Sequence, residues 1–187
     1  MDSVKISRKV KGNKQTKKTF RGVFSADMLP GARKRSDGLY IVNLDNSDQA
    51  GSHWVCIDLR RGKGEKSAYF DSYGLPPPYA AFENFMNNCY THNTKQLQHP
   101  LSTSCGQWCL YFVLRRNQGW GMKKLVWPFG KNFLANDHIM NSVVRKNFKT
   151  EARVIDRTFL QSQISQLMGE NEIWKRYQAQ QTDVRNA

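Results

Sequence analysis

Two segments of the chain carry a histidine and a cysteine where they could form a nucleophile and its base. His53 stands in AGSHWVCIDL at the expected start of a strand, and Cys105 stands in LSTSCGQWCLYF where a loop turns into a helix. The helix dipole and the N–H groups of the first turn favour the thiolate form of such a cysteine, and a neighbouring histidine lowers its pKa further. The pattern therefore predicts a nucleophilic Cys105 with His53 as its base.

Two further polar residues would complete such a site. Asp71 ends the strand that follows the His53 strand, so it would hold the His53 ring if the two strands are neighbours. Gln98 is the best candidate for a neutral donor that, with the backbone N–H of Cys105, would bind the oxyanion of acyl transfer. His99 is a rival base, although strand alternation would place it on the opposite face from Gln98.

Each of these residues also has a plain structural interpretation. His53 could be a hydrogen-bonded structural histidine, Cys105 a core thiol, Asp71 a turn residue and Gln98 a surface amide. Trp54, the neighbour of His53, either walls a substrate cleft or packs in the core of the sheet, and the sequence does not separate the two.

The remaining cysteines and histidines indicate packing rather than metal binding. We expect Cys56 and Cys109 in the core, and His92 and His138 at the surface. The sequence has no CxxC pair and no His/Cys cluster with zinc spacing, so we predict no metal site.

The elements that must position these residues indicate an α+β domain. Apolar runs predict strands at 39–44, 53–60, 67–73 and 96–99. Helices are expected at 79–89, after Cys105, after a cap at Asn136 or Asp137, and at 155–168. We therefore expect a single domain over 21–187, with a central, mainly antiparallel sheet packed by helices and a helical C-terminal region.

The chain is strongly basic, with a formal net charge of +14 and a pI near 9.8. Residues 1–20 are polar and show no hydrophobic periodicity, so we expect a flexible basic arm. The charge predicts sequence-independent binding of DNA or another polyanion, because no base-reading motif is present. The candidate contacts are Lys9, Lys11, Lys14, Lys17, Lys18, Arg33, Lys34 and Arg35.

The run GSHW, then YFDSYG, then Gln98 ahead of Cys105 in QHPLSTSCGQWC resembles the adenovirus protease (adenain) family. It is most similar to the cysteine proteases of adenovirus-like viruses and virus-like transposons. In that family the order is His, Asp or Glu, Gln, then Cys, which matches His53, Asp71, Gln98 and Cys105. The resemblance runs from about Phe20 to about Arg116.

The resemblance implies the fold that adenain shares with the proteases of ubiquitin-like modifiers. It implies an endopeptidase that cleaves capsid and core precursors at glycine-containing sites during virion maturation. It also implies activation by DNA and by a capsid-derived peptide, with no cofactor required for the chemistry. Cys89 corresponds roughly to the cysteine that tethers this peptide through a disulfide, although its spacing to Gln98 differs from the family's.

Two other functions stay open from the sequence. The same catalytic set occurs in proteases that deconjugate ubiquitin-like modifiers, and a third possibility is a DNA-binding virion protein without enzymatic activity. The shortness of the chain, its charge and the Gly74–Pro78 run favour the viral protease. We expect a monomer in the virion and in the host nucleus or a cytoplasmic virus factory, neither secreted nor bound to a membrane.

Overall fold

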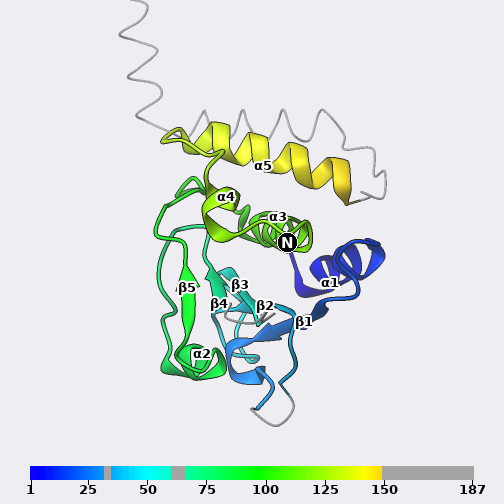
Figure 1. Ribbon diagram of the computed structural model, residues 1–187, viewed down its shortest axis with the longest axis vertical. Coiled ribbons are helices and arrows are strands. Elements are labelled where there is room, and N and C mark those ends of the chain that lie inside the picture. Colours follow the sequence, from blue (N-terminus) through cyan, green and yellow to red (C-terminus); the bar gives the residue numbers. More distant parts are fainter. Residues whose placement is uncertain (32–34, 60–65, 149–187) are drawn as a thin grey trace, which may run out of the picture. The chain divides into compact units, whose positions relative to one another are not determined.

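The computed structural model describes residues 1–31, 35–59 and 66–148 (Figure 1). Met1–Lys149 form one compact unit. The helix predicted at 155–168 lies outside the described residues. Within the described part, no helix is long and apolar enough to cross a membrane.

A five-stranded sheet in the order β1-β2-β3-β4-β5 forms the centre of the unit. Its central strands β2, β3 and β4 are antiparallel neighbours, whereas the edge strands β1 and β5 each run parallel to the strand beside them. The α+β class is confirmed, with a mixed sheet in place of a mainly antiparallel one. The strands are β1 (Phe20–Ser25), β2 (Leu39–Asn43), β3 (Trp54–Asp58), β4 (Ser67–Phe70) and β5 (Tyr90–His92).

The short strand predicted at 96–99 is absent, and β5 lies a few residues earlier. The backbone N–H groups of Leu97 and Gln98 both donate to the carbonyl oxygen of Ser72, at 2.9 and 3.1 Å. These bonds tie the segment to the loop after β4 instead of to a strand. That attachment brings Gln98 towards the end of the sheet where Asp71 lies.

Helices cover both faces of the sheet, so every residue of β2 is buried. Leu39 and Ile41 pack in a core shared with the long buried helix α3, whereas Tyr40 and Val42 face a second core under α2. The helix α3 contacts β3, α1 and α5, which explains why its sequence is apolar almost all round. These helices are α2 (Ala80–Phe85), α3 (Cys105–Asn117) and α5 (Phe133–Asn147), with the short α4 (Met122–Val126) and the 3-10 turn η1 (Ala26–Met28) between the larger elements.

The prediction of a flexible arm over residues 1–20 is wrong. Residues Ser3–Gly12 form helix α1, whose N-cap Asp2 accepts a hydrogen bond from the N–H of Lys5. Ile6 and Val10, one helical turn apart, are fully buried in the core shared with α3. Burying two such side chains contributes about 1.5–3 kcal/mol each, which is enough to fix a short basic helix against the domain.

Helix α5 also begins earlier than predicted. Its N-cap is Asn132, whose side chain accepts a hydrogen bond from the N–H of Ala135. Asn136 and Asp137, the predicted caps, lie inside the helix and are buried. Both point into the protein, and Asp137 takes part in the site described below.

Candidate active site

The pairing of β3 with β4 brings His53 and Asp71 to the same end of the sheet. His53 immediately precedes β3 and Asp71 immediately follows β4, and the two strands are antiparallel with Cys56 opposite Phe70. Extending this register places the start of β3 beside the residues that follow β4. The predicted neighbourhood of the two residues is therefore a direct result of strand order.

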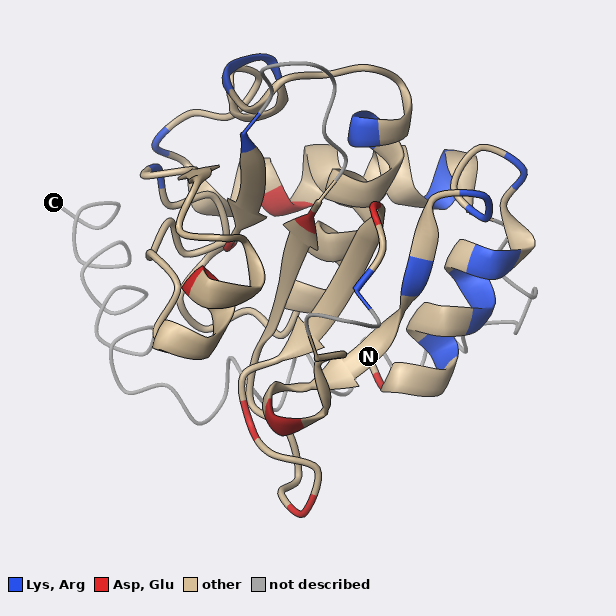
Figure 2. Cartoon of the chain, turned by 60° about the horizontal axis from the view of Figure 1, so that its bottom comes forward, with Lys and Arg blue, Asp and Glu red and all other residues tan. Residues whose placement is uncertain are grey.

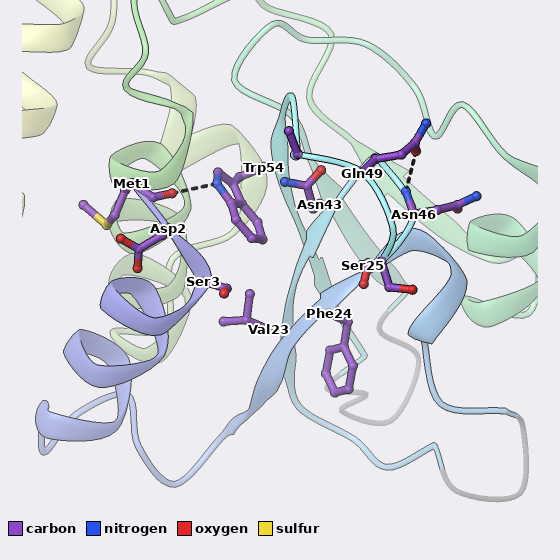
Figure 3. A pocket seen from close by; sticks show the side chains of 13 residues that line it. Met1, Asp2, Ser3, Val23, Phe24, Ser25, Asn43, Asn46, Gln49 and Trp54 are labelled. Carbon is purple, nitrogen blue, oxygen red and sulfur yellow. Dashed lines mark hydrogen bonds between the residues drawn. The ribbon is translucent and has the colours of Figure 1, made fainter.

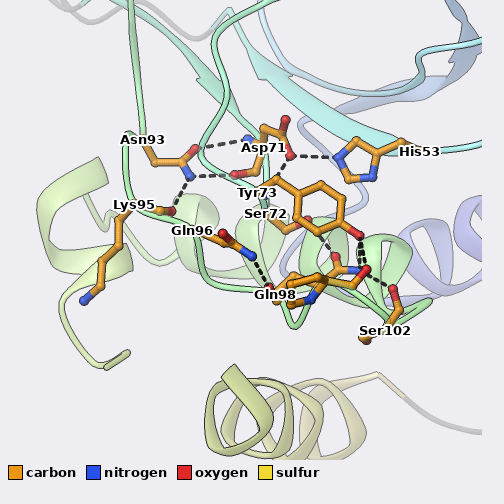
Figure 4. Close-up of polar contacts among 10 residues, drawn as sticks. His53, Asp71, Ser72, Tyr73, Asn93, Lys95, Gln96, Gln98 and Ser102 are labelled. Atoms are coloured by element: carbon orange, nitrogen blue, oxygen red, sulfur yellow. Dashed lines mark hydrogen bonds and ion pairs between the residues drawn. The ribbon is translucent and has the colours of Figure 1, made fainter. Parts of the chain in front are cut away.

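Asp71 is hydrogen-bonded to the His53 ring, with 2.7 Å between Nε2 and Oδ1 (Figure 4). The two side chains are only 13% and 2% exposed. The same carboxylate oxygen accepts the N–H of Tyr73 at 2.8 Å. Asn93 braces the backbone of Asp71 on both sides, because its Oδ1 accepts the Asp71 N–H and its Nδ2 donates to the Asp71 carbonyl. The carboxylate is thus held in one place beside the ring.

Cys105 is the first residue of α3, and its side chain and the His53 ring interact so that each shifts the pKa of the other. Burial alone would raise the pKa of the Cys105 thiol. The hydrogen bond with His53 and the backbone N–H groups of Trp54 and Gly106 outweigh burial and lower that pKa below its usual 9.0. The positive end of the α3 dipole acts in the same direction.

The pKa of His53 moves the opposite way. Burial would lower it, but the hydrogen bonds and negative charges of Asp71 and Cys105 raise it from 6.5 to about 9. Both shifts favour transfer of the thiol proton to the imidazole. At neutral pH the arrangement favours a thiolate–imidazolium pair.

Gln98 is buried and its amide is oriented by fixed partners. Its Oε1 accepts from Ser72 Oγ at 2.7 Å, and its Nε2 donates to the carbonyl oxygen of Ser102 at 2.6 Å. The hydroxyl of Tyr73 lies 3.2 Å from the same Nε2. This network points the N–H side of the amide towards the loop that leads into Cys105 (Figure 4).

The loop before Cys105 is anchored by a carboxylate from α5. Ser102 Oγ donates to Ser104 Oγ at 2.6 Å, and Ser104 Oγ donates to Asp137 Oδ1 at 2.9 Å. The indole N–H of Trp108 donates to the same oxygen at 2.7 Å. The N-cap Ser104 makes no capping hydrogen bond with its side chain, because its hydroxyl is used for this anchor.

Trp54 lines a cavity and also packs, partly buried, against the core shared with α3. The cavity has a volume of about 350 Å³ and lies between the N-terminal residues, β1 and the loop that leads into β3 (Figure 3). The indole N–H of Trp54 donates to the carbonyl oxygen of Met1 at 3.0 Å. A Cβ atom on Gly106 would lie 3.1 Å from Met1 Cβ and 3.6 Å from Trp54 Cδ1. Gly106, which follows Cys105, therefore lies beside two residues that line the cavity.

The other cysteines and histidines stand apart from this constellation. Cys56 and Cys109 are fully buried, as predicted, whereas Cys89 is an exposed free thiol at the start of the edge strand β5. His99 Nδ1 accepts the N–H of Leu101, and His138 is exposed. His92, predicted at the surface, is half-buried in β5. Among the described residues, no group of three or more His, Cys, Asp or Glu side chains could hold a metal ion.

The predicted nucleic-acid contacts divide into three groups. Lys9 and Lys11 lie on α1 and Lys14, Lys17 and Lys18 on the loop after it, and several basic residues gather along α1 (Figure 2). Arg35 is engaged within the protein: its guanidinium donates to the carbonyl oxygen of Phe85 at 2.6 Å. Arg33 and Lys34 lie outside the described residues.

Sequence reasoning missed four residues that support the predicted set: Ser72, Tyr73, Asn93 and Asp137. Ser72 and Tyr73 directly follow Asp71, so they could have been found by extending each site residue to its neighbours. Asn93 and Asp137 are distant in sequence and carry no local signal, because only the folded sheet and helices bring them to the site.

No known family model and no curated protein matches the sequence. Among solved structures, the chain is similar to the crystal structure of the ASFV pS273R protease, with 19% sequence identity and a TM-score of 0.43. The similarity covers 60% of this chain and 44% of that one, so the chain spans less than half the length of the protein it matches. The chemical interpretation therefore rests on the geometry of the site itself.

Proposed function

We propose that the chain is a cysteine protease that cleaves peptide bonds by acyl transfer. The observation that carries this proposal is the His53 ring, hydrogen-bonded to the buried Asp71 carboxylate at 2.7 Å and close enough to the Cys105 thiol for each group to shift the pKa of the other. A histidine between a carboxylate and a thiol at a helix N-terminus is the arrangement that nucleophilic cysteine catalysis requires.

In the first half of the reaction, the Cys105 thiolate attacks the carbonyl carbon of the scissile peptide bond and forms a C–S bond. The carbonyl oxygen becomes an oxyanion, which the Cys105 N–H and the Gln98 amide stabilise. The intermediate collapses as the C–N bond breaks, and the His53 imidazolium gives its proton to the leaving amine. Asp71 keeps the ring oriented throughout.

In the second half, neutral His53 takes a proton from a water molecule that attacks the acyl carbon. The C–S bond breaks, the carboxylic acid product leaves, and the thiolate–imidazolium pair is restored. All groups in this cycle belong to the chain, so the chemistry requires no cofactor.

For the substrate, we carry forward the resemblance of GSHW, YFDSYG and QHPLSTSCGQWC to the adenain family. It favours an endopeptidase that processes viral capsid and core precursors at glycine-containing sites, in the virion and in the host nucleus or a cytoplasmic virus factory. The exposed thiol of Cys89 is available to a capsid-derived peptide that activates the enzyme through a disulfide. We propose that the protein acts as a monomer.

DNA is the second proposed activator. Its support is the +14 net charge and the basic surface of α1 with the following loop, which includes Lys11, Lys14, Lys17 and Lys18. Because these contacts would be to phosphates, the stimulation should be independent of sequence and should weaken as salt rises.

The test is cleavage of fluorogenic peptides ending in Gly-Gly or Gly-Xaa-Gly by wild type and by Cys105→Ala, each with and without duplex DNA. Turnover by wild type that disappears in Cys105→Ala supports the protease, and its increase with DNA supports the activator. Cleavage of modifier–fluorophore conjugates in preference to peptides would instead favour a deconjugating protease. No turnover together with a Cys105 that iodoacetamide does not alkylate would leave only a DNA-binding protein.

A further inference from the structure

Tyr73 lies between the proposed base and the proposed oxyanion donor. Its ring stacks on the His53 ring, with centroids 4.9 Å apart and planes inclined by 30°. Its hydroxyl oxygen lies 3.2 Å from Gln98 Nε2 and 3.4 Å from the carbonyl oxygen of Pro100 (Figure 4). The Tyr73 ring thus packs on His53, while its hydroxyl contacts the Gln98 amide.

The Gln98 amide has no hydrogen left for a substrate in this arrangement. Nε2 carries two hydrogens, and their acceptors are the Ser102 carbonyl at 2.6 Å and the Tyr73 hydroxyl at 3.2 Å. An oxyanion that forms beside Gln98 must therefore either displace the Tyr73 hydroxyl or be bound by it. Displacement would also break the stack of the Tyr73 ring on His53.

If the Tyr73 hydroxyl itself binds the oxyanion, only the direction of its O–H bond has to change. Tyr73 accepts a hydrogen bond from Gln98 and has its own O–H free to rotate away from Pro100, to which its 3.4 Å contact is long for an O–H···O bond. Burial and the negative charges of Cys105 and Asp71 raise the pKa of Tyr73 above its usual 10.0, so the hydroxyl keeps its proton. A hydrogen bond accepted from Gln98 polarises the O–H and makes it a better donor.

We propose that the Tyr73 hydroxyl is a catalytic oxyanion donor, which hydrogen-bonds the tetrahedral intermediate while Gln98 donates to the Tyr73 oxygen. Gln98 then stabilises the intermediate through Tyr73 instead of by a direct hydrogen bond, because both hydrogens of its Nε2 are engaged. No covalent bond to Tyr73 forms or breaks, and its proton stays on the hydroxyl throughout. The inference rests on the proposed cysteine protease activity.

The test is Tyr73→Phe, which deletes the hydroxyl and leaves the ring that stacks on His53. Losing one oxyanion donor of several is expected to lower kcat about 10- to 100-fold with little change in KM. The matched control is Tyr79→Phe, which deletes an exposed hydroxyl that donates to the Leu44 carbonyl. We expect this control to stay within about twofold of wild type.

Two further measurements separate a catalytic role from a structural one. Alkylation of Cys105 by iodoacetamide forms no oxyanion, so its rate and pH profile should be the same in Tyr73→Phe and wild type. The inhibitor acetyl-Leu-Gly-Gly-glycinal forms a tetrahedral adduct with the thiol, so its Ki should rise by the same factor as kcat falls.

Four results would overturn the proposal. Activity of Tyr73→Phe within about twofold of wild type would show that the hydroxyl is idle, and a gain in activity would show that it blocks the oxyanion site. An equal loss of alkylation would assign Tyr73 to the support of His53. A wild type that neither cleaves peptides nor alkylates at Cys105 would remove the proposed function and this inference with it, so the two failures are distinct.

Discussion

Replacing Asp71 with Asn should lower the pKa of His53, and so destabilise its imidazolium form, without changing the shape of the site. The carboxylate Oδ1 lies 2.7 Å from His53 Nε2, and an amide of the same size keeps a hydrogen bond but removes the negative charge. The shift of the His53 pKa from 6.5 to about 9 corresponds to roughly 3 kcal/mol in favour of the imidazolium, at about 1.4 kcal/mol per pKa unit.

Asp71 shares this effect with the Cys105 thiolate. We therefore assign about half of it to Asp71, so Asp71→Asn should lower the pKa of His53 by roughly one unit, to about 8. The pKa of Cys105 should rise at the same time, because the thiolate loses part of its cationic partner.

The assay is the rate of iodoacetamide alkylation from about pH 5 to pH 10. The modified Cys105 peptide is measured by mass spectrometry, because the exposed thiol of Cys89 also reacts. Wild type should show one step where the thiolate forms, below the usual pKa of 9.0, and a second near pH 9 where His53 loses its proton. In Asp71→Asn the second step should move down and the first should move up.

Asp48→Asn is the control, since it removes a carboxylate from an exposed position on the loop that leads into β3. It should move neither step. If the second step stays near pH 9 in Asp71→Asn, the charge of Asp71 does not set the pKa of His53, and the argument for its orienting role fails.

Three further predictions concern residues that support the site. Ile6→Ala should lower the free energy of unfolding, measured in urea, by about 2–4 kcal/mol. Val4→Ala, at a side chain that is 62% exposed, should change it by less than about 0.5 kcal/mol. Equal effects would mean that α1 is not packed as described. Ser72→Ala removes the hydrogen bond that orients the Gln98 amide and should lower kcat in the fluorogenic assay roughly fivefold, which corresponds to about 1 kcal/mol. If the rate of Cys105 alkylation fell by the same factor, Ser72 would not act only through the groups that bind the oxyanion. Asp137→Ala leaves the Ser104 hydroxyl and the Trp108 indole N–H without their acceptor and should lower the free energy of unfolding, measured by thermal unfolding, by about 2–4 kcal/mol. Asp137→Asn keeps an acceptor oxygen and should lose less. Equal losses in the two variants would mean that packing of the side chain, not its hydrogen bonds, provides the stability.

The three central strands, and the meeting of His53 with Asp71, could be predicted because the signal for each is local. The central strands are short apolar runs between turns, and His53 and Asp71 each adjoin one of them. Once those strands are neighbours, the residues at their ends must meet. The nucleophile is recognisable in the same way, because a loop, a glycine and an apolar helix follow one another around Cys105.

The remainder depends on contacts between distant segments. Helix α1 was not predicted because Ile6 and Val10 are isolated among basic residues. Only the folded core shows that both side chains are buried and that these two contacts are enough to hold the helix against the domain. The attachment of Leu97 and Gln98 to Ser72 replaces a predicted strand with a loop. Asp137 lies in α5, far along the chain from the Ser104 and Trp108 donors that it holds, so no pattern around it in the sequence indicates that role.

The contact of Met1 with Trp54 and Gly106 determines where the molecule can be extended. Any residue placed ahead of Met1, such as the remnant of an affinity tag, would begin at the rim of the cavity that Met1 and Trp54 line. A few extra residues there would occupy the cavity at high effective concentration, because they are tethered to the same chain. The same position could hold a short peptide that keeps ligands out of the cavity until a protease removes it.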